Sequence, residues 1–238
     1  MKLSAPIFIL KQQAKALSRK ENIALHRALD RVASREGFAG WSLLSAKAAL
    51  DDSSATLLAQ LQPGDLVLVA SRPGQGKTML SLDLAIQTMR QGNRAAFFTL
   101  EFTCADVARC FTAIGEEPIK FNDSFLVDDS DRICADYIIA RLESAPAKML
   151  VVIDYLQLLD QRRDTPDLMQ QVRQLKEFAM RRELVVVCLS QIDRAYDSTK
   201  RPFPGRDDVR LPNPLDLGLF TKVCFLNQGR LRLSDASA

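Results

Sequence analysis

The sequence predicts an α/β fold with a mostly parallel central sheet, preceded by a small all-α unit at the N-terminus. From Gly64 onward, short continuous apolar segments alternate with segments of helical periodicity. This alternation is typical of a parallel sheet that is buried on both faces. Before that point the apolar residues follow helical spacing alone. We therefore expect a helical unit over residues 1–52 and an α/β domain over residues 53–238.

The N-terminal unit is predicted to contain three helices, since apolar residues recur at helical spacing around 10–17, over 23–35 and around 43–48. Gly37 follows the second of these segments and is placed to end that helix in a left-handed conformation. Residues 51–54 form a polar break, which we interpret as either a linker or the start of another helix.

The α/β domain is predicted to alternate strands and helices without an internal repeat. Right-handed crossovers between parallel strands bring the carboxyl ends of the strands to one edge of the sheet, where ligands bind. The expected strands are 66–70, 95–100, 124–127, 149–153, 184–189 and 223–226, and the expected helices are 77–90, 104–114, 132–143 and 167–182.

Composition and charge narrow the class of protein. No apolar run approaches the roughly 20 residues that a membrane helix needs, and the first residues do not form a signal peptide, so we expect no membrane association. The five cysteines form no CxxC pair and His26 is the only histidine, which argues against a metal site and favours free thiols in the cytoplasm. The first fifty residues hold nine Lys or Arg against three Asp or Glu, a weak indication of a polyanionic partner.

The strongest motif follows the first predicted strand and opens the next predicted helix. It has the pattern of a phosphate-binding loop, with glycines that let the backbone wrap phosphates and a Gly-Lys-Thr at a helix N-terminus. Its first position is normally glycine and is serine here, and the alternative is a glycine-rich turn that binds nothing. The candidate nucleotide-binding residues are Ser71, Arg72, Pro73, Gly74, Gln75, Gly76, Lys77, Thr78 and Met79.

The chemistry of this loop predicts binding of ATP with Mg²⁺. Lys77 supplies positive charge to the β and γ phosphates, and the Thr78 hydroxyl is a magnesium ligand. Asp154 ends a buried strand and is the expected acidic partner of the same ion, opposite Thr78.

Two further strand ends supply candidate catalytic groups. Glu101 follows the predicted strand 95–100 and could polarise the water that attacks the γ-phosphate. The alternative is an acidic cap for the helix that follows Thr103. Gln191 follows the strand 184–189, where a neutral amide could contact the γ-phosphate, or could simply end the strand.

Together these segments resemble one family. Ser-Arg-Pro-Gly-Gln-Gly-Lys-Thr at 71–78, Thr-Leu-Glu-Phe at 99–102, Ile-Asp-Tyr-Leu-Gln-Leu-Leu at 153–159 and Leu-Ser-Gln-Ile-Asp-Arg at 189–194 are similar to the C-terminal ATPase domain of DnaB-type replicative helicases. The similarity covers about residues 60–226 in the family's order. It implies a RecA-like P-loop NTPase fold, Mg-ATP hydrolysis, assembly into a homo-oligomeric ring such as a hexamer, and single-stranded DNA in the centre of that ring.

The resemblance also implies residue roles. Lys77 and Thr78 match the phosphate-loop pair, Glu101 the catalytic glutamate, Asp154 the magnesium-holding aspartate and Gln191 the sensor glutamine. The family's DNA-contacting loop follows that glutamine and carries an Asp-Leu-Arg element, which is similar to Asp208-Val209-Arg210 here. The implied nucleic-acid-binding residues are Arg210, Arg206, Arg201 and Lys200, although a solvated surface loop is the alternative.

The chain departs from the family at both ends. Residues 1–52 stand where the family has a larger N-terminal domain, and the family's trans-acting arginine finger has no clear match, with Arg230 and Arg232 as the possible substitutes. We therefore carry two hypotheses: a helicase-type ATPase that acts on single-stranded DNA, and a regulatory or adaptor protein that uses the same fold as a nucleotide-dependent binding module without unwinding. A small-molecule kinase shares the phosphate loop but has an arginine-rich lid that is not seen here.

Overall fold

A computed structural model describes residues 3–5, 7–160, 165–197, 201–211 and 213–235, with residues 49–52 and 160 described by their backbone alone. Contacts divide the chain into two compact units, Met1–Asp52 and Ser53–Ala238. Within the described residues no helix is both long and apolar enough to cross a bilayer.

The first unit is helical. It contains α1 (Ile7–Glu21), α2 (Leu25–Arg35) and the first part of α3 (Trp41–Leu58). Its core is formed by six side chains of which none is more than 2% exposed: Leu10, Ala14, Ala28, Val32, Ala33 and Leu44. Gly37 has φ 84° and is followed by a hydrogen bond from the Phe38 N–H to the Ala33 carbonyl, so it ends α2 as predicted.

The second unit is built on a seven-stranded sheet in the order β3-β2-β4-β5-β1-β6-β7. Six strands run parallel, and β7 pairs antiparallel with β6. The strands are β1 (Leu66–Ser71), β2 (Ala95–Thr99), β3 (Phe125–Asp128), β4 (Leu150–Asp154), β5 (Val185–Gln191), β6 (Lys222–Asn227) and β7 (Arg230–Asp235). The predicted α/β class and mostly parallel sheet are confirmed.

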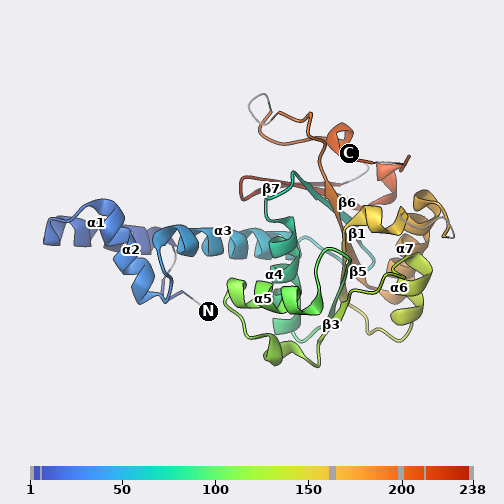
Figure 1. Cartoon of the computed structure of the whole chain (residues 1–238), viewed down its shortest axis with the longest axis horizontal. Helices are drawn as coiled ribbons and strands as arrows, with labels where there is room; N and C mark the ends of the chain where they lie inside the picture. The colour runs from blue at the N-terminus through green and yellow to red at the C-terminus, as the bar shows by residue number, and fades with distance from the viewer. Residues whose placement is uncertain (1–2, 6, 161–164, 198–200, 212, 236–238) are drawn as a thin grey trace. The chain divides into compact units, whose positions relative to one another are not determined.

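Helices cover both faces of this sheet. Figure 1 shows α4 and α5 on one face and α6 and α7 on the other, so the central strands are buried on both sides. The apolar runs in β1, β4 and β5 follow from this burial. The helices are α4 (Lys77–Arg90), α5 (Cys104–Ile114), α6 (Ala135–Arg141) and α7 (Leu168–Arg182), with 3₁₀ turns η1 (Pro118–Phe121), η2 (Leu156–Asp160), η3 (Arg206–Asp208) and η4 (Leu217–Leu219).

The expectation for residues 51–54 is wrong, because they lie inside α3 and form neither a linker nor a helix start. The side chain of Ser54 is fully buried, and its hydroxyl donates a hydrogen bond to the Asp83 carboxylate of α4 and accepts one from Gln87. Leu57 is also buried, one turn further along. These tertiary contacts stabilise the helix where the local sequence favours a break.

Residues 223–226 fall in β6 as predicted, and the structure adds beyond it a seventh strand, β7, which was not predicted from the sequence. Gln228 and Gly229 both have positive φ and form the two-residue turn between β6 and β7. The alternating Arg-Leu-Arg-Leu pattern of β7 suits an edge strand with one exposed face.

Candidate nucleotide-binding site

The loop of residues 71–78 connects the carboxyl end of β1 to the N-terminus of α4. Gly74 has φ 77° and Gly76 has φ 85°, a left-handed conformation that glycine adopts at little cost. A Cβ atom added to either glycine would meet no heavy atom within 4 Å, so the loop backbone faces open space. The loop is therefore shaped as a cradle with room for a ligand.

The N-terminus of α4 faces the same space. Lys77, Thr78 and Met79 form the first turn of this helix, where backbone N–H groups have no carbonyl partner within the helix. Such a terminus favours anions through these N–H groups and the helix dipole. The Lys77 side chain is 8% exposed and adds a positive charge at a position shielded from water.

Asp154 lies at the end of β4 and contacts Thr78. The Thr78 hydroxyl donates a hydrogen bond of 3.0 Å to Asp154 Oδ2, while Oδ1 is buried and has no hydrogen-bond partner. Burial raises the pKa of Asp154 to about 6, against the opposing effects of the Thr78 hydrogen bond and the Lys77 charge. Burying a carboxylate oxygen without a partner costs free energy unless a cation or a hydrogen-bond donor binds to it.

Glu101 stands at the same edge of the sheet. Thr99, the last residue of β2, pairs in register with Asp154, and its hydroxyl accepts hydrogen bonds from the Glu101 and Phe102 N–H groups at 3.1 and 3.3 Å. The negative charge of Glu101 contributes to the raised pKa of Asp154, so the two carboxylates are close enough to interact. Glu101 itself is exposed.

The alternative that Glu101 caps α5 is not supported. The N-cap of this helix is Thr103, which forms a capping box with Asp106. The Glu101 carboxylate is thus left facing solvent at the end of the sheet, where it is available for chemistry.

Gln191 ends β5, the strand between β1 and β4. It pairs in register with Ser71, so the loop of residues 71–78, Gln191 and Asp154 follow three neighbouring strands. The Gln191 side chain is half-buried, and its backbone carbonyl accepts a hydrogen bond of 2.8 Å from the Arg210 N–H.

A cavity of about 310 Å³ lies beside the phosphate loop. The Gln228 N–H in the turn between β6 and β7 donates a hydrogen bond of 2.8 Å to the Gln75 side-chain oxygen, which holds this turn against the loop. The cavity is lined by Arg72, Pro73, Gln75, Arg194, Asn227 and Gln228. Its volume falls at the lower end of the range for small-ligand pockets.

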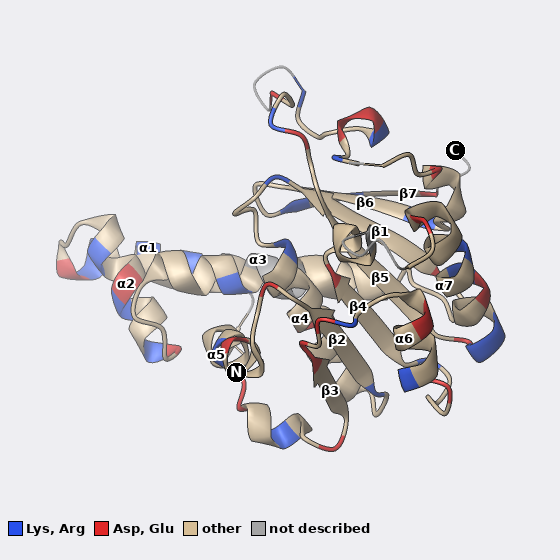
Figure 2. Cartoon of the chain, turned by 45° about the vertical axis from the view of Figure 1, so that its right-hand side comes forward, with Lys and Arg blue, Asp and Glu red and all other residues tan. Residues whose placement is uncertain are grey.

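The segment from Ile192 to Arg210 leaves β5 and returns to pair with its end. Ile192 and Val209 form an antiparallel bridge, which places Arg210 next to Gln191. The Arg210 side chain is exposed, and Figure 2 shows that the loop carries charges of both signs. The DNA-contact residues predicted from the sequence thus share one loop, with acidic residues between them.

Two of these arginines already have partners within the chain. The Arg201 guanidinium is 2.8 Å from the Asp208 carboxylate, and Arg206 donates a hydrogen bond of 3.0 Å to the Asp235 carbonyl. Arg210 is therefore the loop arginine best placed to meet an external anion. Lys200 lies outside the described residues.

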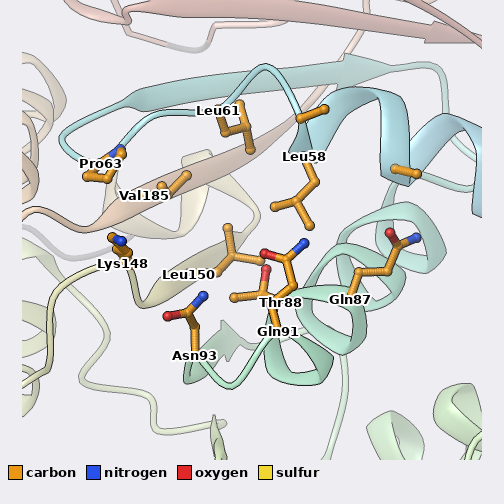
Figure 3. Close-up of a pocket in the computed structure, with 12 residues that line it drawn as sticks. Leu58, Leu61, Pro63, Gln87, Thr88, Gln91, Asn93, Lys148, Leu150 and Val185 are labelled. Atoms are coloured by element: carbon orange, nitrogen blue, oxygen red, sulfur yellow. The ribbon is translucent and has the colours of Figure 1, made fainter.

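A second cavity, of about 350 Å³, lies at the other end of α4 and is lined by none of the predicted site residues. The residues that line this cavity, drawn in Figure 3, include Gln91 and Asn93 together with Leu150 and Val185, the first residues of β4 and β5. The candidate nucleotide site is thus at the opposite edge of the sheet from this cavity.

Two positioning contacts at the candidate site were not predicted from the sequence. The Thr99 hydroxyl holds the turn that presents Glu101, and a threonine two residues before an acid is a detectable signal for such a turn. The bond between Gln75 and Gln228 joins residues 153 positions apart, and no local pattern indicates it.

The sequence of the chain matches the model of a known protein family. The model for the DnaB-like helicase C terminal domain matches residues 49–117 and 117–211, which together span more than half of the chain. The chain belongs to this family. The resemblance predicted from the sequence motifs is therefore confirmed.

Curated DnaB-like relatives are similar over the same region. The replicative DNA helicase DnaB of Geobacillus stearothermophilus is 30% identical over 181 residues, which is 63% of this chain and 40% of the relative. That of Leifsonia xyli is 29% identical with the same coverage. The chain thus spans about two fifths of the length of these relatives.

Solved structures agree on the DnaB-like fold. A structure of a DnaB-like replicative helicase, described with its interactions with primase, aligns with 92% of this chain and 64% of its own at a TM-score of 0.56 and 20% identity. A KaiC-like protein from Pyrococcus horikoshii aligns with 68% of this chain and 70% of its own at a TM-score of 0.53 and 18% identity. At these identities the likeness supports the RecA-like fold alone.

Proposed function

We propose that this chain is a helicase-type ATPase, which binds and hydrolyses Mg-ATP at the loop of residues 71–78 and acts on single-stranded DNA. The observation that carries the proposal is the Thr78–Asp154 hydrogen bond, which joins the phosphate loop to a buried acid whose second oxygen has no partner. Family membership supports the same activity.

The described residues fit a magnesium nucleotide. Thr78 and Asp154 offer a hydroxyl and a carboxylate oxygen, which are the hard ligands that Mg²⁺ prefers. The open backbone at Gly74 and Gly76 accommodates phosphates, and Lys77 provides a buried positive charge for them. When bound, Mg²⁺ supplies charge neutralisation on the phosphate oxygens.

Glu101 is the candidate catalytic base. Its carboxylate is exposed at the edge where β2 and β4 end, and the turn held by Thr99 fixes its backbone. From there it accepts a proton from, or orients, a water that attacks the γ-phosphate. Gln191, on the strand next to β1, is the candidate contact to the same phosphate group.

Arg210 is the candidate contact to single-stranded DNA. Its side chain is exposed, and its backbone is fixed to the end of β5 by the bridge between Ile192 and Val209. A single arginine held in this way binds a phosphate of the DNA backbone, with an affinity that falls as salt rises. The acidic residues of the loop limit any non-specific attraction.

The proposal is tested by ATP turnover with and without single-stranded DNA. The wild-type chain is expected to hydrolyse ATP in the presence of Mg²⁺ and to do so faster with single-stranded DNA. Lys77→Ala is expected to lose both activities, and Lys120→Ala, at an exposed position of the same unit, is the matched control. Turnover that survives in Lys77→Ala would overturn the proposal.

A homo-oligomer is part of the proposal. Arg232 packs on the rings of Phe203 and Phe225 and donates a hydrogen bond of 2.5 Å to the Pro204 carbonyl of its own chain. This internal engagement occupies Arg232 within its own chain, so a trans-acting arginine would have to come from another position. The alternative, an adaptor that binds nucleotide without unwinding, needs no such arginine. Measured DNA unwinding by purified chain distinguishes the two.

A further inference from the structure

Gln157 bridges three parts of the molecule that the proposed function treats separately. It lies in η2, three residues after Asp154, and its amide nitrogen donates hydrogen bonds to Ser190 Oγ at 3.1 Å and to the Arg210 carbonyl at 2.6 Å. Ser190 precedes Gln191 on β5 and is fully buried. One side chain on the segment after Asp154 thus contacts both the end of β5 and the backbone of the candidate DNA-binding residue.

These contacts fix the Arg210 backbone from two sides. Its N–H donates to the Gln191 carbonyl at 2.8 Å, and its carbonyl accepts from Gln157. A carbonyl can only accept, so the Gln157 amide must turn its nitrogen toward Arg210. A change in the position of either Gln157 or Gln191 therefore moves the peptide unit that carries the Arg210 side chain.

The oxygen of the Gln157 amide, unlike its nitrogen, forms no hydrogen bond. This atom, Oε1, is buried. A buried acceptor without a donor weakens the arrangement that contains it, because the desolvation of that oxygen is uncompensated. The Gln157 side chain is therefore held through its nitrogen alone, by Ser190 and the Arg210 carbonyl.

We propose that Gln157 is a positioning residue that couples the nucleotide state at Asp154 and Gln191 to the placement of Arg210. This inference rests on the proposed function and deepens it. It names the contact through which ATP at the carboxyl edge of the sheet changes the affinity of Arg210 and its loop for single-stranded DNA. Coupling of this kind is reciprocal: if nucleotide changes DNA affinity by a given factor, DNA changes nucleotide affinity by the same factor.

The test measures that factor rather than activity. Binding of a fluorescein-labelled oligothymidylate is followed by anisotropy at fixed salt, without nucleotide and with Mg²⁺ and a slowly hydrolysed ATP analogue. The wild-type affinities are expected to differ by at least about fivefold between the two conditions. In Gln157→Leu, which removes the donor, and in Gln157→Glu, which keeps the size but places a second acceptor against the Arg210 carbonyl, they are expected to agree within about twofold.

A merely structural role would give a different result. Both variants are expected to keep the wild-type affinity for the analogue in the absence of DNA, and Gln170→Leu, at an exposed position on α7, is the matched control that keeps the coupling. Coupling retained in both Gln157 variants, or a loss of DNA affinity that is equal with and without the analogue, would overturn the inference while leaving the ATPase proposal intact. A wild-type chain that does not bind the analogue overturns the proposed function and this inference with it.

Discussion

The contact between Thr78 and Asp154 shows how a single buried residue is placed for its chemistry. Asp154 is fully buried at the end of β4, where only one of its oxygens has a partner. Such a residue weakens the nucleotide-free fold, because its charge is poorly solvated. The same property makes it a strong ligand for a cation that arrives with a nucleotide.

The raised pKa of Asp154 predicts a pH dependence of stability. Its folded value of about 6 lies above the ordinary value of 3.8, so the folded chain takes up the proton more readily than the unfolded chain. The free energy of unfolding without nucleotide should therefore fall as pH rises from about 4 to about 6 and then level off. Asp154→Asn should remove this slope and raise the free energy of unfolding at pH 7 by on the order of 1–2 kcal/mol. Urea unfolding at several pH values measures the slope and the free energy of unfolding. A slope that is unchanged in Asp154→Asn would contradict the assignment of this pH dependence to Asp154.

Glu101→Gln separates chemistry from binding. The amide keeps the size of the side chain but cannot accept a proton, so ATP turnover should fall by about 100-fold or more while the affinity for Mg-ATP changes by less than about threefold. Turnover and equilibrium binding are measured on the same preparation. Glu143→Gln, at an exposed position, is the control that should behave as wild type. A variant with normal turnover would remove Glu101 from the proposed mechanism.

At the scale of secondary structure, the elements next to the site were the easiest to predict. The helix that begins at Lys77 and ends at Arg90 has the predicted bounds, since the glycine before it and its apolar face are both local signals. The ends of β2, β4 and β5 were predicted within two residues. Buried parallel strands are continuous apolar runs, so a polar residue that follows one marks its carboxyl end.

The elements that were missed depend on contacts between distant residues. The polar residues 51–54 favour a break locally, and only the buried bonds of Ser54 with α4 explain why α3 continues. β7 needs β6 beside it and a turn at Gln228 and Gly229, and its alternating pattern is too short to stand out. The contacts of Gln157 are likewise tertiary, although its motif was recognised.

Ser54→Ala tests the explanation for α3. Removing the hydroxyl deletes its bonds with Asp83 and Gln87 in a fully buried position, so the free energy of unfolding should fall by about 1–2 kcal/mol. Thr56→Ala, two residues further on at an exposed position, should change it by less than about 0.5 kcal/mol. Chemical unfolding followed by circular dichroism gives both values. Equal effects at the two positions would mean that the buried bonds do not hold this part of the helix.

At the scale of the whole molecule, the seven-stranded sheet brings groups from four separate segments to one edge. The phosphate loop, Glu101, Asp154 and Gln191 come from separate segments of the sequence, and the parallel topology makes them neighbours. The cavity of about 350 Å³ lies at the opposite edge of the sheet and is lined by none of these groups.

Assembly is the prediction that belongs to this scale. If the chain works as a helicase-type motor, light scattering after size exclusion should show a homo-oligomer in the presence of Mg²⁺ and a slowly hydrolysed ATP analogue. In Lys77→Ala, adding Mg²⁺ and the analogue should not increase the size of the oligomer. A monomer under all conditions, with no unwinding, would contradict the motor and support the adaptor.

The central claim is that the loop of residues 71–78 binds a magnesium nucleotide with Asp154. Isothermal titration of the chain with a slowly hydrolysed ATP analogue tests it most directly, with and without Mg²⁺. The account predicts one saturable site per chain that depends on Mg²⁺ and is weakened at least about tenfold in Lys77→Ala and in Asp154→Ala. The absence of binding at millimolar analogue, or equal binding by the wild type and both variants, would contradict it.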